Sequence, residues 1–189
     1  MPLLCVVFAG QFDPYIYGRV HPEQLRIVYV IVALSTIAFP AINILLLRWY
    51  GAVTSFDVQK RKERFAPYVS SAFFFVLGYI LLRRGALPIS IHSIVLGCTA
   101  SLFILALLNS WLKVSAHAAG VGGLAGTAVA LFQINGWFDF GLLTIIILFT
   151  GMVLSARLIL KVHSAREVYI GAIAGFGILY FFVSRGWVI

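Results

Sequence analysis

Six long apolar runs constrain this chain more than any other feature of its sequence. A bilayer core of about 30 Å takes about 20 apolar residues in a helix. The runs do not alternate as the strands of a membrane barrel would, and in lipid a helix is the other structure that satisfies the backbone. The sequence therefore predicts an all-α, polytopic membrane helical bundle with about six transmembrane helices. The runs cover 27–47, 65–82, 89–111, 114–134, 138–160 and 168–183.

Composition supports this prediction, because 62% of the residues are hydrophobic and only 11% are charged. Soluble domains average about 45–50% apolar and about 25% charged residues, so a soluble domain, a disordered chain and a coiled coil are excluded. We expect one six-span domain over 27–189 and a separate N-terminal segment over 1–26. Asp13, Pro14, Arg19 and Pro22 interrupt that segment, which predicts a position at head-group depth.

The basic excess of the chain indicates a membrane partner. Lys and Arg number 14 against 6 Asp and Glu. Basic residues that flank spans set topology and contact anionic lipids, so we expect the lipid bilayer as a partner and no nucleic acid. Cys5 and Cys98 lack CxxC spacing, and Cys98 is expected to be a small core residue. The sequence leaves the oligomeric state open.

Alternating the spans across the bilayer brings three polar connections to one side. These are 48–64, 112–113 and 161–167, and we call the side that they share the basic end. The connections 83–88 and 133–137 fall on the opposite end. Nine of the basic residues lie at the basic end and five at the other. Several of the nine are candidate ligands, so the count does not decide which end faces the cytoplasm.

The third connection carries a histidine and a carboxylate four residues apart. His163 and Glu167 share a face if the segment is helical. A carboxylate on one imidazole nitrogen fixes the tautomer and makes the other nitrogen a better nucleophile or base. Arg157 lies at the end of a span, and its planar fork suits a phosphate. Taken singly, these residues also fit a snorkelling arginine and an interfacial histidine.

The other two connections supply further candidates. Ser115 and His117 stand at the start of the fourth span, where free backbone N–H groups favour an anion. Ser115 fits an N-cap, and His117 fits a proton donor. Lys113, Arg61 and Arg64 add cationic charge that suits either lipid head groups or a phosphorylated substrate.

The glycines after His117 follow small-xxx-small spacing. Ala119 pairs with Gly123, and Gly122 pairs with Gly126. We therefore interpret them as helix-packing residues rather than as a phosphate loop. In the first run, Pro40 predicts a kink.

The spacing Arg157-x5-His163-x3-Glu167, with Ser115-Ala116-His117 upstream, resembles the type 2 phosphatidic acid phosphatase superfamily. The motifs of that family are Lys-x6-Arg-Pro, Pro-Ser-Gly-His and Ser-Arg-x5-His-x3-Asp. This chain has Glu167 in place of Asp and Ala156 in place of Ser. Val114 and Ala116 flank Ser115 where the family has Pro and Gly, and the first motif is altered. The chain is similar to small bacterial members with a six-helix architecture.

The resemblance implies hydrolysis of a lipid phosphate through a phosphohistidine. His163 would attack phosphorus, Glu167 would orient it, and His117 would protonate the leaving alkoxide. The phosphate-binding set would be Arg157, Ser115, Lys113, Arg64 and Arg61. It implies no cofactor and no metal, with phosphatidate, phosphatidylglycerophosphate or polyprenyl phosphates as candidate substrates. It also implies the bacterial inner membrane, with the site at one membrane interface.

Two alternatives from other classes remain open. A degenerate site could bind or transport phosphorylated lipids without chemistry, and this reading predicts that replacing His163 by Gln has no effect. A b-type haem protein would use axial histidines, for which His92, His117 and His163 are the candidates beside or within spans.

Overall fold

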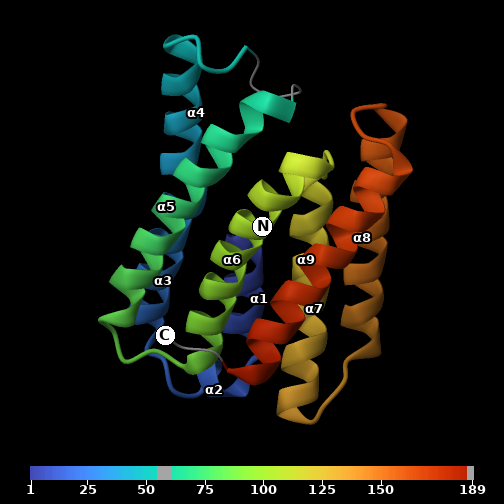
Figure 1. Cartoon of the computed structure of the whole chain (residues 1–189). Coiled ribbons are helices and arrows are strands. Elements are labelled where there is room, and N and C mark those ends of the chain that lie inside the picture. The colour runs from blue at the N-terminus through green and yellow to red at the C-terminus, as the bar shows by residue number, and fades with distance from the viewer. Residues whose placement is uncertain (55–60, 187–189) are drawn as a thin grey trace.

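The computed structural model describes residues 1–54 and 61–186, and its regular structure within those ranges is helical throughout. Six helical segments there are long and apolar enough to cross a membrane, which confirms the predicted all-α bundle. The described parts of three connections lie at the same end of the bundle, at the top of Figure 1, as the alternation of spans predicted. The segments are Pro22–Trp49 (α3, Pro22–Ala33; η1, Leu34–Ala38; α4, Phe39–Trp49), α5 (Phe65–Arg83), α6 (Ile89–Trp111), α7 (Ala116–Asn135), α8 (Phe140–Ile159) and α9 (Ala165–Arg185).

The first and last spans are longer than their apolar runs because each begins at a polar cap. His21 precedes Pro22 at the start of α3, and its Nδ1 accepts the Glu23 N–H at 3.4 Å. Ser164 and Glu167 form a capping box at the start of α9. A hydropathy pattern ends where polar residues start, so it omits these first turns.

The first span contains a π-helical turn over Leu34–Ala38, close to the proline for which a kink was predicted. Pro40 lies two residues after this turn and has no N–H to donate to it. Ser35 Oγ donates to the Ile31 carbonyl at 2.7 Å, which satisfies one polar group in the same stretch. A side chain on Gly78 of α5 would collide with Ser35, so the two helices are in close contact there.

Glycines join α7 and α9 at backbone contact. A Cβ on Gly122 would meet the carbonyl of Ala172, and one on Gly126 would meet the carbonyl of Phe176. In the other direction, a Cβ on Gly175 would meet the carbonyl of Ala119. The interpretation of these glycines as packing residues is confirmed, since small residues let membrane helices approach closely. Figure 1 shows α7 and α9 side by side along most of their length.

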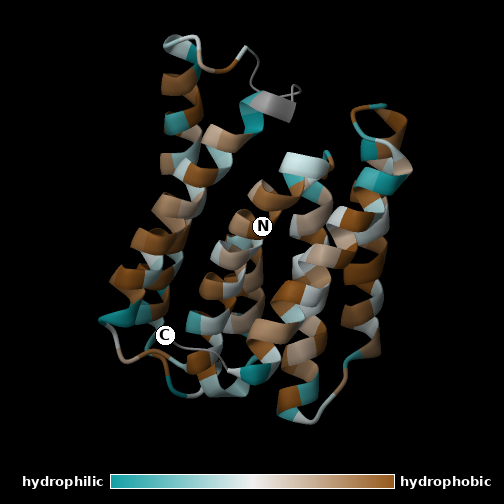
Figure 2. Ribbon diagram, viewed as in Figure 1, coloured by the Kyte–Doolittle hydropathy of each residue, from teal (hydrophilic) through white to brown (hydrophobic). Residues whose placement is uncertain are grey.

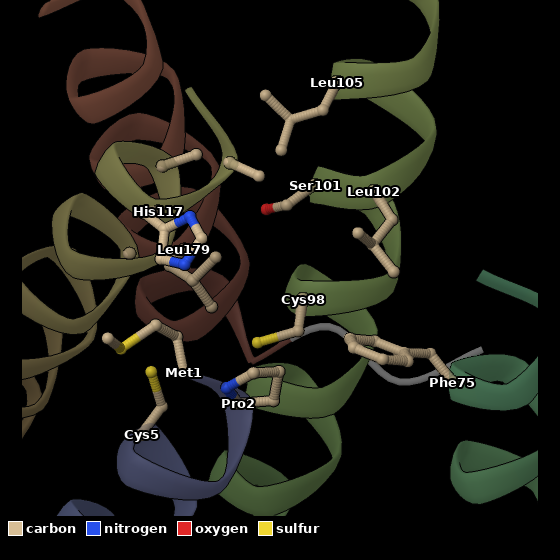
Figure 3. Close-up of a pocket in the computed structure, with 14 residues that line it drawn as sticks. Met1, Pro2, Cys5, Phe75, Cys98, Ser101, Leu102, Leu105, His117 and Leu179 are labelled. Atoms are coloured by element: carbon tan, nitrogen blue, oxygen red, sulfur yellow. The ribbon is translucent and has the colours of Figure 1, made fainter. Parts of the chain in front are cut away.

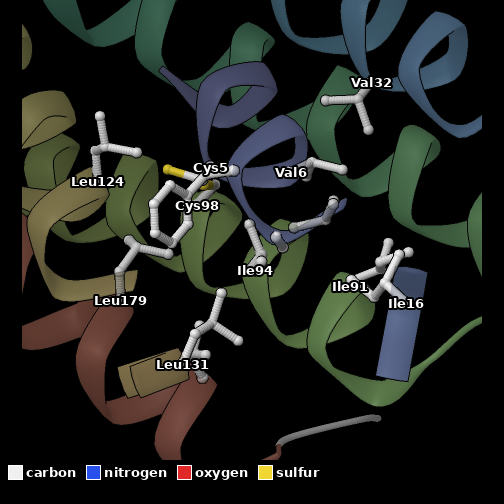
Figure 4. Packing of buried hydrophobic residues seen from close by; sticks show 14 of the residues in the cluster. Cys5, Val6, Ile16, Val32, Ile91, Ile94, Cys98, Leu124, Leu131 and Leu179 are labelled. Carbon is white, nitrogen blue, oxygen red and sulfur yellow. The ribbon is translucent and has the colours of Figure 1, made fainter. Parts of the chain in front are cut away.

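The N-terminal segment contributes to the core. Helix α1 (Pro2–Phe12) packs against α3, α6 and α7, and its Cys5 and Val6 are buried. The short α2 (Pro14–Tyr17) follows, capped by Asp13, whose Oδ2 accepts the Ser90 hydroxyl at 2.6 Å. Cys98 of α6 is buried near Cys5, as expected of a core residue (Figure 4). The placement of residues 1–26 at head-group depth stays a prediction.

Exposed apolar surface is concentrated on the helix faces that point outward. Helix α8 is the extreme case, since only 6% of its most apolar window is buried within the bundle. In Figure 2 the hydrophilic residues gather at the two ends and the hydrophobic residues cover the middle. This distribution supports an integral membrane protein with lipid around its sides.

Candidate functional site

A pocket of about 530 Å³ lies at the basic end, where the three polar connections meet. Arg64, His117, Arg157 and His163 all line it, although they come from three separate connections. Four of the eight predicted site residues are thus brought to one cavity. The remaining lining residues are Ile44, Pro67, Tyr68, Ser71, Leu102, Ala116, Leu160 and Val162.

His163 is held in the short connection between α8 and α9. Lys161 has φ 53°, a left-handed conformation that reverses the chain after α8 ends. His163 Nδ1 then lies 2.9 Å from Glu167 Oε2, and the two side chains are 5% and 18% exposed. The i, i+4 pairing predicted from the sequence is present in the structure.

This geometry fixes the tautomer of His163. An ionised carboxylate only accepts hydrogen bonds, so Nδ1 carries the hydrogen and donates it to Glu167. Nε2 then carries the lone pair, as a nucleophile or base requires. Burial lowers the pKa of His163 below its usual value, and the positive charges of Arg64 and Lys113 lower it further, while Glu167 opposes both effects. The imidazole is therefore kept neutral near pH 7.

Glu167 has a second role as a helix cap. Its Oε2 also accepts the Ser164 N–H at 3.3 Å, and its own N–H donates to Ser164 Oγ at 3.4 Å. This reciprocal pair defines the first turn of α9. The carboxylate that orients His163 is thus anchored to the backbone at the same place.

Ser115 and His117 begin α7. Ser115 is fully buried and caps the helix, because its Oγ accepts the Ala118 N–H at 3.3 Å. Its own N–H donates to the Glu167 carbonyl at 3.2 Å, which ties the start of α7 to the start of α9. His117 follows two residues later and is exposed towards the pocket. Ser115 does not line the pocket, so its role as a phosphate ligand stays a prediction.

Three of the predicted cationic residues lie near the N-terminal ends of α7 and α9. Arg64 ends the 3-10 helix Arg61–Arg64, is 6% exposed, and donates from Nη1 to the Val114 carbonyl at 3.1 Å. Lys113 Nζ donates to the Val162 carbonyl at 3.0 Å. Arg157 lies in the last turn of α8, where it lines the pocket. The side chain of Arg61 lies outside the described residues.

Several residues that line the pocket were not predicted from the sequence, among them Tyr68, Ser71 and Leu102. Tyr68 stands four residues after Arg64 in the helical register, a spacing that could have found it. Ser71 and Leu102 carry no local signal, because only the packing of α5 and α6 brings them to the pocket.

The histidines do not assemble as a haem site that uses His92. His92 lies at the start of α6, at the opposite end from His117 and His163, and its Nδ1 is 3.2 Å from the Pro88 carbonyl. In the part of the chain that the structure describes, no three His, Cys, Asp or Glu side chains gather in a way that could hold a metal ion.

Comparison with known proteins gave no match: no family model, no curated protein and no solved structure is similar to this chain.

Proposed function

We propose that this protein hydrolyses a lipid phosphate monoester or diphosphate through a phosphohistidine on His163. One observation carries the proposal. The buried His163 donates through Nδ1 to Glu167 and shares a pocket with His117, Arg64 and Arg157. A neutral, oriented imidazole beside several cations is the arrangement that nucleophilic attack on an anionic phosphate ester needs. The motif spacing described above points to the same chemistry.

In the first step, Nε2 of His163 forms a bond to phosphorus as the bond from phosphorus to the lipid oxygen breaks. Glu167 stabilises the positive charge that develops on the imidazole. His117 donates a proton to the leaving oxygen, which departs as an alcohol, or as a phosphate monoester from a diphosphate. A positioned proton donor contributes typically about 10²–10⁴-fold to such a step.

In the second step, water attacks the phosphohistidine and the bond from Nε2 to phosphorus breaks. His117, now neutral, takes a proton from that water, so inorganic phosphate leaves and both histidines return to their starting states. The cations stabilise the charge on the phosphoryl oxygens in both steps, which is the main requirement of phosphoryl transfer. We assign this role to Arg157 and Arg64, which line the pocket, and to Lys113, whose charge acts on His163. Arg61, in the same 3-10 helix as Arg64, completes the proposed set.

The proposal is tested by phosphate release in detergent solution. The purified protein is incubated with phosphatidate, phosphatidylglycerophosphate and a polyprenyl diphosphate, with and without EDTA. Wild-type protein is expected to release phosphate in EDTA, whereas His163→Ala is expected to release none. Brief incubation with ³²P-labelled substrate should leave acid-labile label on the wild-type protein alone.

Two results would overturn the proposal. Release that persists in His163→Ala would place the chemistry elsewhere. A folded wild-type protein that binds these lipids but releases no phosphate, and whose binding is unchanged in His163→Gln, would favour binding or transport on a degenerate site.

A further inference from the structure

A second cavity lies directly beside the candidate site. It has a volume of about 390 Å³ and is bounded by α1, α6 and α7, with Leu179 of α9 on its wall. Figure 3 shows His117 pointing into it from α7, on the side where Ser101 of α6 also points in. The volume is within the range of about 300–1,000 Å³ that is typical of small-molecule sites.

The two cavities share part of their lining. Leu102, Ala116 and His117 line both the pocket at the basic end and this second cavity. The proposed proton donor is therefore the point where the two meet. If the leaving oxygen of a substrate contacts His117, the phosphate lies in the pocket at the basic end. The aliphatic part of the substrate then lies on the other side of the imidazole ring, in the second cavity.

The walls of the second cavity suit an aliphatic chain. They include Phe75, Leu105, Leu179 and the thiols of Cys5 and Cys98 (Figure 3). The Ser101 hydroxyl already donates to the Gly97 carbonyl at 2.9 Å. An apolar cavity of this kind gains little from water and accepts apolar ligands.

We propose that this cavity holds the aliphatic chain next to the phosphate ester, so that the lipid chain runs from His117 into the bundle between α1 and α6. The inference rests on the proposed function and names its substrate class: phosphate esters of aliphatic alcohols whose first carbons are enclosed by protein rather than by lipid. Helix α1 then serves as the wall of a chain-binding site.

The test uses a substitution that narrows the second cavity and compares the activity of the protein on alkyl phosphates of different chain length. Ser101→Leu adds volume on the cavity wall and leaves the residues of the phosphate pocket unchanged. Ser110→Leu is the matched control, because Ser110 is exposed on the same helix and its hydroxyl also bonds a backbone carbonyl, that of Leu107 at 2.6 Å. The substrates are ethyl, butyl, hexyl and octyl phosphate at one fixed detergent concentration, with kcat/KM as the readout.

In wild-type protein, kcat/KM is expected to rise with chain length, up to roughly fourfold for each methylene that leaves water. Ser101→Leu is expected to lower kcat/KM for octyl phosphate by tenfold or more relative to Ser110→Leu, and to leave ethyl phosphate within twofold. The retained ethyl phosphate activity shows that the variant is folded.

Two outcomes overturn the inference while the proposed function stands. In one, Ser101→Leu and Ser110→Leu give the same chain-length profile. In the other, Ser101→Leu lowers kcat/KM equally for all four esters while the protein remains folded. Absence of His163-dependent release from every ester would instead overturn the proposed function, and the inference with it.

Discussion

Oε2 of Glu167 accepts two hydrogen bonds, one from Nδ1 of His163 at 2.9 Å and one from the backbone N–H of Ser164 at 3.3 Å. The first bond orients the imidazole, and the second holds the carboxylate against the first turn of α9. A glutamate therefore reaches the histidine at an ordinary hydrogen-bond distance in the place where the resembled family has an aspartate. The longer side chain fits because its oxygen is also bound to the backbone.

A single substitution can separate the two roles of Glu167, which are to orient His163 and to cap α9. Glu167→Gln keeps the capping box, which accepts either residue, but removes the charge beside His163. We expect kcat to fall by roughly 10²–10⁴-fold, as happens when a histidine loses its orienting carboxylate, with little change in thermal stability. Phosphate release and thermal unfolding in detergent measure the two effects. Unchanged kcat in Glu167→Gln would contradict the orienting role.

Shortening the same side chain tests the geometry. Glu167→Asp restores the residue of the resembled family but withdraws the carboxylate by one methylene. Because the His163 contact is satisfied by Glu, we expect Asp to lower kcat by about tenfold rather than raise it. A higher kcat in Glu167→Asp would show that the glutamate impairs the wild-type protein.

The acid limb of activity should follow the charge on His163. Its pKa lies below the usual value, so the neutral form of the imidazole predominates at pH 7 and is lost as the pH falls through that lowered pKa. Lys113→Met removes one of the charges that lower the pKa, so the acid limb of kcat/KM should move to higher pH. Lys161→Met is the control, since Lys161 is exposed on the neighbouring connection and is absent from the causes of the shift. An acid limb that does not move in Lys113→Met would remove His163 as its source.

Arg157 should matter far more than a nearby exposed arginine. Arg157→Gln removes a cation that lines the pocket, and we expect kcat/KM to fall by about 10²–10³-fold, the usual cost of one transition-state donor. Arg166→Gln removes an exposed cation at the same end of the bundle and should change kcat/KM by less than twofold. Equal losses in both variants would indicate a general surface-charge effect.

The glycine contact between α7 and α9 predicts a sharp difference between two glycines on one helix. A methyl group on Gly175 would meet the carbonyl of Ala119, whereas nothing lies within 4 Å of the corresponding position at Gly177. Gly175→Ala should therefore destabilise the protein by about 1–3 kcal/mol, and Gly177→Ala should be tolerated. Thermal unfolding in detergent compares the two, and equal stabilities would show that the helices separate freely at this point.

The helical bundle and the grouping of the site residues at one end could be predicted from the sequence. Both follow from the lengths of the apolar runs and from the order of the spans. Span length gives the helices, and alternation gives the side on which Arg64, His117 and His163 meet. The pairing of His163 with Glu167 followed from helical spacing. These features are local, or depend only on the order of the spans.

What the sequence did not predict depends on packing between distant segments. Helix α1 looks too short and too interrupted for a span, yet Cys5 and Val6 are buried because α3, α6 and α7 leave room for it. The spacing Ser164-x-x-Glu167 is itself typical of a capping box, so this part of the site has a local sequence signal besides the pairing of Glu167 with His163. The cavity between α1 and α6 has no sequence signature, because its lining residues come from five helices, α1, α5, α6, α7 and α9.

The backbone contact between α7 and α9 also determines how the two histidines are held relative to each other. His117 and His163 stand at the starts of two helices that are joined by glycines along their length and by the bond from Ser115 N–H to the Glu167 carbonyl. We therefore expect the distance between the two histidines to stay the same when a substrate binds. Arg64, in the connection before α5, is tied to the same place by its hydrogen bond to the Val114 carbonyl.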